Sequence, residues 1–197
     1  MFTGIIETVG EVTGLVKEGS NLRVYIKSAI SPELKIDQSV AHNGICLTVE
    51  HIEGDVHIVV AIDETLKKTD LRFWKQGSKI NLERCMQAGG RLDGHIVQGH
   101  IDQVAQCTDV LEQDGSWIFT FEYDASAGNI TVEKGSICVN GISLTVLNSG
   151  KNSFSVAIIP YTYEHTTMKD IKKGDMVNLE FDIIGKYVAR LMSQRNQ

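Results

Sequence analysis

Hydrophobic and polar residues alternate along most of this chain, in short runs that turn-forming residues separate. Residues 22–26 (LRVYI) alternate strictly, and residues 56–62 (VHIVVAI) are almost entirely apolar. A period of two is typical of β-strands, because successive side chains of a strand point to opposite faces. Strands are therefore predicted over residues 5–16, 22–26, 45–49, 56–62 and 79–82, and again over residues 103–111, 117–123, 136–139, 142–148, 154–159 and 176–181.

Helical patterns are few and short. Helical turns are expected near residues 31–34, 64–71, 124–128 and 162–169, and the first predicted strand is interrupted at two glycines, Gly10 and Gly14, without becoming helical. The exception is the C-terminus, where an apolar stripe at helical spacing predicts an amphipathic helix; the stripe consists of Ile184, Tyr187, Val188 and Leu191. This helix either packs on its own barrel or joins subunits.

One stretch of seven residues occurs twice. Residues 43–49 (NGICLTV) return as residues 140–146 (NGISLTV), so that only Cys46 is exchanged, for Ser143. The offset of 97 residues persists downstream, where residues 178–180 repeat the Asn-Leu-Glu of residues 81–83. Solenoid repeats have periods of about 20–50 residues. The longer period indicates a duplicated domain.

The repeated stretch predicts a tight hairpin. Asn-Gly supplies the two positive-φ residues of a type I′ turn. In the strand that follows, Ile45, Leu47 and Val49 share one face, and Cys46 and Thr48 share the other. An ordinary half-buried strand would explain one such copy, but two copies that differ only at Cys46 favour a functional site.

About six strands per half, separated by turns, predict a mainly β protein. We expect two tandem, duplicated six-stranded antiparallel Greek-key β-barrels and a C-terminal α-helix. The expected domains are residues 1–86, residues 87–182, and residues 183–197 for a helix that serves oligomerisation.

Composition and charge exclude several classes of function. With 42% hydrophobic and 22% charged residues, the chain is typical of a soluble globular protein. Its net charge of −6 argues against nucleic-acid binding, which favours a basic face. No apolar run reaches the roughly 18 residues of a membrane span, and residues 1–7 do not resemble a signal peptide. A cytoplasmic location is expected.

Cysteine and histidine spacing does not predict a metal site. The four cysteines, Cys46, Cys85, Cys107 and Cys138, lack any C-x-x-C spacing. His95 and His100 are five residues apart, which would place them on opposite faces of a strand. His42, His51, His57 and His165 are interpreted as ordinary surface or packing residues.

Four motifs together resemble the alpha chain of riboflavin synthase over essentially the whole chain. They are residues 1–6 (MFTGII), 39–49 (SVAHNGICLTV), 94–102 (GHIVQGHID) and 141–146 (GISLTV). The resemblance implies a transferase that dismutates 6,7-dimethyl-8-ribityllumazine. One lumazine molecule gives a four-carbon unit to a second, which yields riboflavin and 5-amino-6-ribitylamino-uracil.

The same resemblance implies an assembly. Members of the family are homotrimers, held partly by the C-terminal helices, with each active site between the N-terminal barrel of one subunit and the C-terminal barrel of its neighbour. No metal or redox cofactor is implied. Association with lumazine synthase is a further partner that the resemblance raises.

By resemblance, five residues line the active site: Cys46, His100, Ser143, Thr145 and Asp182. Three of these positions break the symmetry of the repeat, because Cys46 is matched by Ser143, His100 by Ile5, and Asp182 by Cys85. As hypotheses, His100 is a base for the acidic 7-methyl proton, and Cys46 is a nucleophile or acid–base group if its pKa is lowered. Ser143 with Asp182 would polarise a hydroxyl or water.

Substrate-binding segments are implied in matched sets, with backbone groups at the pteridine edge and hydroxyls at the ribityl chain. The first half would supply Gly4, Ile5, Ile6, Cys46, Leu47, Thr48, Val60, Ala61, Ile62, Asp63, Glu64 and Thr65. The second half would supply Gly99, His100, Ile101, Lys134, Ser143, Leu144, Thr145, Ile158, Ile159, Pro160, Tyr161, Thr162 and Tyr163. Tyr161 and Tyr163 depart from the more Glu-Thr-like pattern that is expected there.

Three other functions compete with this interpretation. A non-catalytic lumazine- or flavin-binding protein, such as the light-emission antenna proteins related to this family, keeps the barrels but loses the reactive residues that are present here. A barrel of the flavin-dependent reductases would need a nicotinamide-binding domain, and the chain has no strand-linked G-x-G-x-x-G. A purely structural interaction protein explains neither the motifs nor the asymmetry of the repeat.

Overall fold

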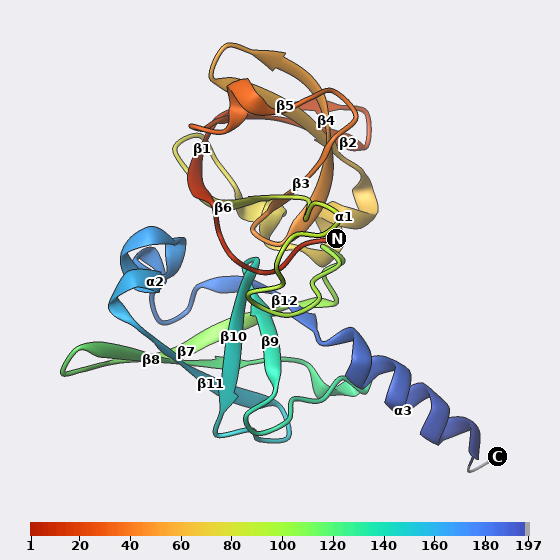
Figure 1. Cartoon of the computed structure of the whole chain (residues 1–197), viewed down its shortest axis with the longest axis vertical. Helices are drawn as coiled ribbons and strands as arrows, with labels where there is room; N and C mark the ends of the chain where they lie inside the picture. Colours follow the sequence, from red (N-terminus) through yellow and green to blue (C-terminus); the bar gives the residue numbers. More distant parts are fainter. Residues whose placement is uncertain (196–197) are drawn as a thin grey trace.

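The computed structural model describes residues 1–195, which form two closed antiparallel β-barrels, one above the other in Figure 1. The first barrel consists of β1 (Thr8–Glu18), β2 (Asn21–Lys27), β3 (Ser39–His42), β4 (Ile45–Glu53), β5 (Val56–Ala61) and β6 (Lys79–Arg84). The second consists of β7 (Gln103–Gln113), β8 (Ser116–Glu122), β9 (Ser136–Val139), β10 (Ile142–Leu147), β11 (Ser153–Ile158) and β12 (Met176–Phe181).

Both barrels have the same strand order. The first runs β1-β2-β5-β4-β3-β6, and the second has the equivalent ring of β7 to β12. Three consecutive hairpin strands with the preceding strand beside the last of them form a Greek key. The predicted duplicated six-stranded barrels are therefore confirmed.

Short helices occupy equivalent places in the two halves. They are η1 (Ser31–Glu33), α1 (Asp63–Lys68), η2 (Asp70–Phe73), η3 (Ala125–Ala127), α2 (Pro160–His165) and η4 (Thr167–Asp170).

The first strand differs from its prediction, because β1 is continuous from Thr8 to Glu18. Its ladder with β2 absorbs Gly14 as a register shift between Val12 and Gly14 instead of breaking there.

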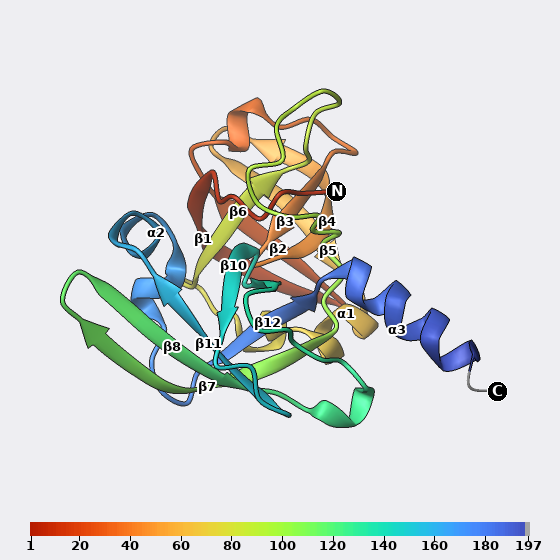
Figure 2. The same cartoon turned by 60° about the horizontal axis from the view of Figure 1, so that its bottom comes forward.

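The C-terminal helix α3 (Ile183–Arg195) points away from both barrels, as Figure 2 shows from a second direction. Its apolar stripe of Ile184, Tyr187, Val188 and Leu191 is between 54% and 67% exposed, so the stripe does not pack on its own barrel. Residues 196–197 of the predicted helical segment lie outside the described residues. No helix in the described part of the chain combines the length and apolarity that crossing a bilayer requires.

The repeated Asn-Gly dipeptides form the predicted turns. Asn43 and Gly44 have φ values of 46° and 79°, and Asn140 and Gly141 have φ values of 46° and 82°. His42 pairs directly with Ile45, which leaves a two-residue loop. Beyond the turn, the alternating apolar residues of β4 are buried and Thr48 is exposed, as the alternation predicts.

The two turns meet at the junction between the barrels. A Cβ on Gly44 would lie 2.8 Å from the backbone nitrogen of Gly141, and a Cβ on Gly141 would lie 2.8 Å from that of Gly44. Any side chain at either position would therefore push the barrels apart. Positive φ and this close approach both require glycine.

Four buried asparagines connect the barrels around this contact. Within the first barrel, Asn43 Oδ1 accepts a hydrogen bond from the Asn81 backbone N–H at 2.8 Å. Across the junction, Asn81 Nδ2 donates to the Asn140 carbonyl at 2.9 Å. The symmetric bonds are Asn178 N–H to Asn140 Oδ1 at 2.8 Å and Asn178 Nδ2 to the Asn43 carbonyl at 2.9 Å. Buried amides satisfied in this way fix one relative orientation of the barrels.

Asp70 breaks the symmetry of this network. Its carboxylate accepts from Asn43 Nδ2 at 2.9 Å and from Asn178 Nδ2 at 2.7 Å. Burial raises the pKa of Asp70 to about 6 even though these donors lower it. The second half has Thr167 at the equivalent place, and its backbone N–H donates to Asn81.

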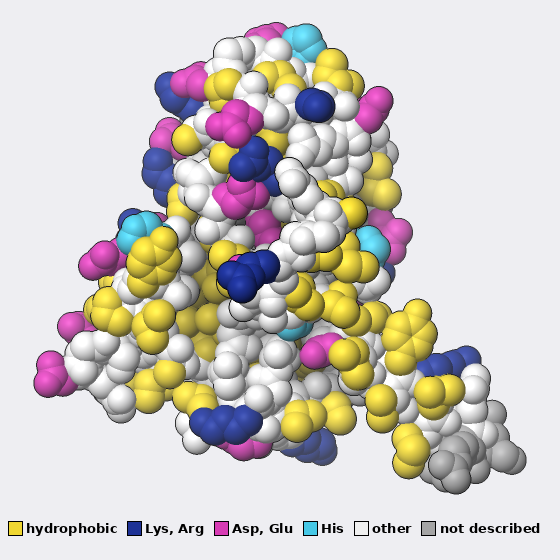
Figure 3. Space-filling view, viewed as in Figure 1, with side chains coloured by type: hydrophobic (Ala, Val, Ile, Leu, Met, Phe, Trp, Pro, Cys, Tyr) yellow, Lys and Arg dark blue, Asp and Glu magenta, His cyan; other side chains and the backbone are white. Residues whose placement is uncertain are grey.

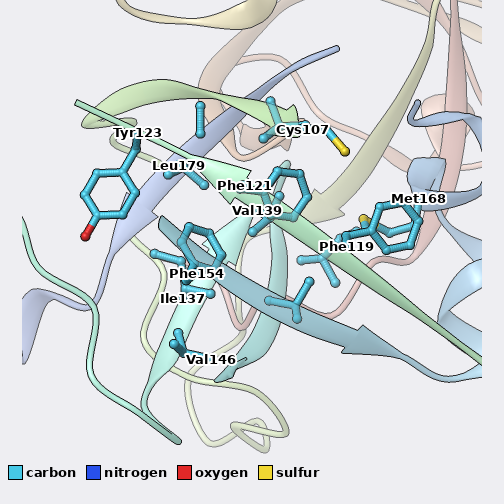
Figure 4. Close-up of a cluster of buried hydrophobic side chains, with 14 of the residues drawn as sticks. Cys107, Phe119, Phe121, Tyr123, Ile137, Val139, Val146, Phe154, Met168 and Leu179 are labelled. Atoms are coloured by element: carbon cyan, nitrogen blue, oxygen red, sulfur yellow. The ribbon is translucent and has the colours of Figure 1, made fainter. Parts of the chain in front are cut away.

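The barrel interiors differ in chemistry. The second interior is aromatic: Figure 4 shows Phe119, Phe121 and Phe154 packed together, and the rings of Phe121 and Phe154 are 5.6 Å apart. Such aromatic pairs contribute about 0.5–1.5 kcal/mol beyond the area that they bury. The first interior is aliphatic, and it contains His42 and His57 where the repeat has Val139 and Phe154.

His42 and His57 are fully buried members of a directed hydrogen-bond chain. The Val40 carbonyl can only accept, so His42 Nδ1 donates to it at 3.0 Å and His42 Nε2 must accept. His57 Nε2 therefore donates to His42 Nε2 at 2.9 Å, and His57 Nδ1 accepts from Ser31 Oγ at 2.8 Å. The chain satisfies both imidazoles only while both are neutral.

Burial lowers the pKa of His42 to about 3 and that of His57 to about 4, and the neighbouring imidazole lowers that of His42 further. Both values are depressed below the ordinary 6.5, so their contribution to stability is complete above pH 6.5 and is lost as the pH falls toward 4. We expect a loss of up to about 1.4 kcal/mol per pH unit for each imidazole.

The measurement is the free energy of unfolding by denaturant between pH 7 and pH 4. A variant with His42→Val and His57→Phe, the residues of the second barrel, should lose less stability over this range than the original chain. The difference between the two proteins isolates the imidazoles, because Asp70 is common to both. Equal losses in both proteins would contradict the assignment.

Candidate functional site

Each barrel has one place where two neighbouring strands separate. Pairing of β4 with β5 begins at Val49, and no pairing with β5 is found in the described structure for residues 46–48. Pairing of β10 with β11 likewise begins at Val146, beyond residues 143–145. Cys46 pairs with Ala41 of β3, one residue beyond the His42–Ile45 pair that closes the turn, in a position whose backbone groups point away from β3. We call residues 46–48 and 143–145 the first and second open edges.

A segment from outside the barrels covers part of each open edge. The Gly99 carbonyl accepts from the Cys46 backbone N–H at 2.9 Å, and the Gly4 carbonyl accepts from the Ser143 backbone N–H at 2.8 Å. Both glycines have positive φ, and a Cβ on Gly99 would lie 2.5 Å from Cys46 Cβ. Only glycine allows this approach.

These contacts cross between the two halves of the repeat. Residues 4–6 belong to the same half as Cys46, and residues 99–101 belong to the same half as Ser143. In the structure the two segments are exchanged, so that residues 4–6 meet the second open edge and residues 99–101 meet the first. The exchange follows from an antiparallel crossing, in which Phe2 and Val97 bond to each other's backbone.

The second open edge contains a serine–histidine pair. His95 Nδ1 lies 2.6 Å from Ser143 Oγ, and the His95 side chain is 9% exposed. Burial lowers the pKa of His95, although the Asp182 carboxylate raises it in part. The imidazole is therefore neutral near pH 7 and can accept a proton from the Ser143 hydroxyl or from a molecule bound there.

The sequence pattern does not predict His95 as an active-site residue, because its spacing from His100 raises only the question of a metal site. The available signal was the motif GHIVQGH, in which both histidines follow glycine. Among the described residues, no three His, Cys, Asp or Glu side chains gather as ligands of a metal ion would.

The first open edge has different chemistry. Cys46 is partly buried beside Cys85, the residue that matches Asp182 in the repeat. Burial raises the pKa of Cys46, so its thiol is protonated near pH 7. The lowered pKa that a nucleophilic role requires is therefore not found.

His100 is exposed at the first open edge, and Glu180 Oε2 accepts from its backbone N–H at 2.8 Å. Thr145 is exposed on the same face of β10 as Ser143. Asp182 accepts from the Ile184 backbone N–H at 2.9 Å and so caps the start of α3. Within one chain, the five candidate residues thus divide between the open edges: Cys46 and His100 lie at the first, and Ser143, Thr145 and Asp182 belong to the second barrel.

The remaining candidate segments follow the separating strands. Residues 60–65 continue from β5 into α1, and residues 158–163 continue from β11 into α2. Ile62 and Ile159 are 54% and 60% exposed at equivalent positions. Tyr163 stacks on Trp117 with ring centroids 3.8 Å apart, so this tyrosine packs on its own barrel. Lys134 is exposed in a positive-φ turn.

Comparison with known proteins matches both halves. The model of the lumazine binding domain matches residues 3–85 and again residues 98–182. Riboflavin synthase of Bacillus subtilis is 38% identical, over 100% of this chain and 92% of that protein. Riboflavin synthase of Mycobacterium bovis is 41% identical, over 98% of each.

A solved structure supports the same relationship. LumP complexed with riboflavin has a TM-score of 0.84 and 25% identity, and the match covers 92% of this chain and 99% of LumP. Since the domain model matches both halves and these two relatives, both above 30% identity, cover 98–100% of the chain, this chain belongs to the riboflavin synthase family.

Proposed function

We propose that this chain is a transferase that converts two molecules of 6,7-dimethyl-8-ribityllumazine into riboflavin and 5-amino-6-ribitylamino-uracil by transfer of a four-carbon unit. The relatives named riboflavin synthase match it from end to end. The observation that carries the proposal is the pair of open edges, which are related by the repeat but differ at their reactive positions.

The duplication suits a reaction between two copies of one molecule. Each open edge offers unpaired strand backbone for the edge of a flat heterocycle, and exposed hydroxyls of Thr48 or Thr145 for a polyol chain. Holding both molecules in place turns a bimolecular encounter into a positioned reaction. The residues that differ between the two edges then provide different acid–base groups to the donor molecule and to the acceptor molecule.

The second open edge supplies a neutral base beside a hydroxyl. In our proposal, His95 withdraws the proton of Ser143 or of a water molecule as oxygen adds to a ring carbon, and Asp182 stabilises the resulting imidazolium. His100 removes the proton of the 7-methyl group at the first edge. Cys46 acts as a protonated thiol that contacts the ring.

We propose that the complete site forms between subunits of a homotrimer. One support is the division of the candidate residues between two edges of one chain. The other is the exposed apolar stripe on α3, visible as hydrophobic side chains along the projecting helix in Figure 3. A helix face of this kind is stabilised when it packs against another subunit.

A non-catalytic binding protein is the second candidate, because LumP shares the fold and has been solved with riboflavin. That function needs the open edges but not the serine–histidine pair.

We also propose a cytoplasmic location, since the four cysteines are free thiols, which a reducing compartment maintains. Association with lumazine synthase stays a prediction, which copurification of the two proteins would test.

The first test is turnover. Purified protein mixed with 6,7-dimethyl-8-ribityllumazine should produce riboflavin without an added cofactor, followed by absorbance and fluorescence. His100→Ala should lower kcat by about 10²–10⁴-fold, the contribution of a positioned base, and Cys46→Ser should lower it less because the thiol stays protonated. Lumazine that binds and shifts its spectrum but never reacts would favour the binding protein.

The second test concerns His95. Ser143→Ala and His95→Gln should each lower kcat strongly, and the double variant should lose little more, because the pair acts as a unit. Since the pKa of His95 is lowered, the acid limb of the kcat profile should lie below pH 6.5, where an ordinary imidazole titrates. Additive losses in the double variant would argue against a coupled pair.

The third test concerns the assembly. Leu191→Asp should convert a trimer into smaller species in light scattering, because a carboxylate cannot be buried in an apolar contact, and activity should fall with it. Ala189→Asp adds the same carboxylate at an exposed position of α3 outside the apolar stripe, and this variant should stay trimeric as the control for the helix itself.

Mixing variants then locates the site. If the site forms between subunits, mixed trimers of His100→Ala and Ser143→Ala chains contain some sites with neither change, and activity returns on mixing. If one chain builds its own site, every site carries one change and the mixture stays inactive.

A further inference from the structure

Two buried glutamates hold the segments that cover the open edges. Glu83 accepts from the Thr3 backbone N–H at 2.6 Å, from Thr3 Oγ1 at 2.6 Å and from the Gly4 backbone N–H at 3.0 Å. Glu180 accepts from the backbone N–H groups of Gln98, Gly99 and His100 at 2.6, 2.8 and 2.8 Å. We call residues 3–5 and 98–100 the first and second straps.

Neither carboxylate has a cation within salt-bridge distance in the described part of the chain, although Glu83 is only 4% and Glu180 only 2% exposed. Successive N–H groups around a positive-φ residue form a concave site for an anion, and Gly4 and Gly99 provide that geometry. Each strap is therefore an anion site occupied by a side chain of the same protein. A buried carboxylate without these donors would be costly.

The straps cross between the barrels. Glu180 lies near the end of β12 in the second barrel, but the Gly99 carbonyl of its strap accepts from Cys46 in the first barrel. Glu83 lies near the end of β6 in the first barrel, but the Gly4 carbonyl of its strap accepts from Ser143 in the second barrel. Each open edge is thus bounded by a segment that the other barrel anchors.

We propose that Glu180 and Glu83 are positioning residues that act crosswise: Glu180 sets the backbone of Gly99 and His100 over the first open edge, and Glu83 sets that of Gly4 and Ile5 over the second. This proposal rests on the proposed function for its catalytic consequence, since His100 is the proposed base. Its structural consequence, that each barrel controls the other's edge, does not depend on turnover.

The experiment compares Glu180→Gln with Glu83→Gln in the full chain, each the matched control for the other. Glutamine keeps the size but turns an NH₂ group toward N–H donors, so one strap should loosen. Cys46 is the reporter for the first edge, because Gly99 covers it and its thiol is partly buried. Its rate of alkylation at alkaline pH is measured by peptide mass spectrometry, which separates it from Cys85.

Glu180→Gln should raise the alkylation rate of Cys46 by about 10- to 100-fold, the factor that corresponds to losing hydrogen bonds to a charged group. Glu83→Gln, which loosens the strap at the other edge, should leave that rate unchanged. Hydrogen exchange should speed up at residues 98–100 in the first variant and at residues 3–5 in the second.

Ligand binding gives the functional readout. Riboflavin should protect Cys46 in the original chain and in Glu83→Gln but not in Glu180→Gln, and calorimetry should show that each variant loses a different binding event. In the turnover assay, Glu180→Gln should lower kcat/KM by about 10²-fold, the effect of misplacing a reacting group by about 1 Å.

Equal effects of both variants on Cys46, or no effect of Glu180→Gln, would overturn the crosswise proposal. If the original chain neither binds riboflavin nor turns over lumazine, the proposed function fails, while the alkylation and exchange results still decide the role of the glutamates.

Should Glu83→Gln fail to fold, Thr3→Val is the substitute variant. It removes the hydroxyl, one of the three donors to Glu83, and leaves the backbone N–H groups of residues 3 and 4 bonded to the carboxylate. It should speed exchange at residues 3–5 and not the alkylation of Cys46, and the reverse would overturn the proposal.

Discussion

The contact of the two Asn-Gly turns is the constraint on which the rest of the structure depends. Gly44 and Gly141 approach so closely that neither tolerates a Cβ, and Asn81 and Asn178 each reach across to the opposite turn. Because these polar groups are buried, any other arrangement of the barrels would leave several of them unsatisfied, at about 1–3 kcal/mol each. The network thereby converts two similar barrels into one rigid unit with fixed distances between their edges.

That fixed arrangement makes the crossing straps useful. A strap anchored on one barrel can position a carbonyl over the other only if the barrels do not move relative to each other. The buried asparagines provide the rigidity, and the buried glutamates transmit it to the backbone beside Cys46 and Ser143. Preorganised groups of this kind favour catalysis because they need not reorganise during the reaction.

Duplication provided the scaffold, and divergence at particular positions separated the roles of the halves. Cys46, which lies beside Cys85, gives the first edge a protonated thiol, whereas Ser143 and Asp182 together with His95 give the second edge a polar environment. The interiors diverged as well, because His42 and His57 form a polar chain where the other barrel packs Val139 and Phe154. A strand that buries one face tolerates such changes when each polar atom finds a partner.

The sequence by itself determined the duplication, the positions of most strands along the chain, the Asn-Gly turns and the alternation that places Ile45 inside and Cys46 outside. These features depend on local geometry, and a period of two or a positive φ is visible in the residues themselves. The tertiary structure decided which segment meets which edge, that His95 contacts Ser143, and that the pKa of Cys46 is raised. Those properties depend on groups far apart in the chain, and on a burial that no local pattern encodes. Residues 4–6 and Cys46 belong to the same half of the repeat. The antiparallel crossing at Phe2 and Val97 nevertheless places residues 4–6 against the other barrel.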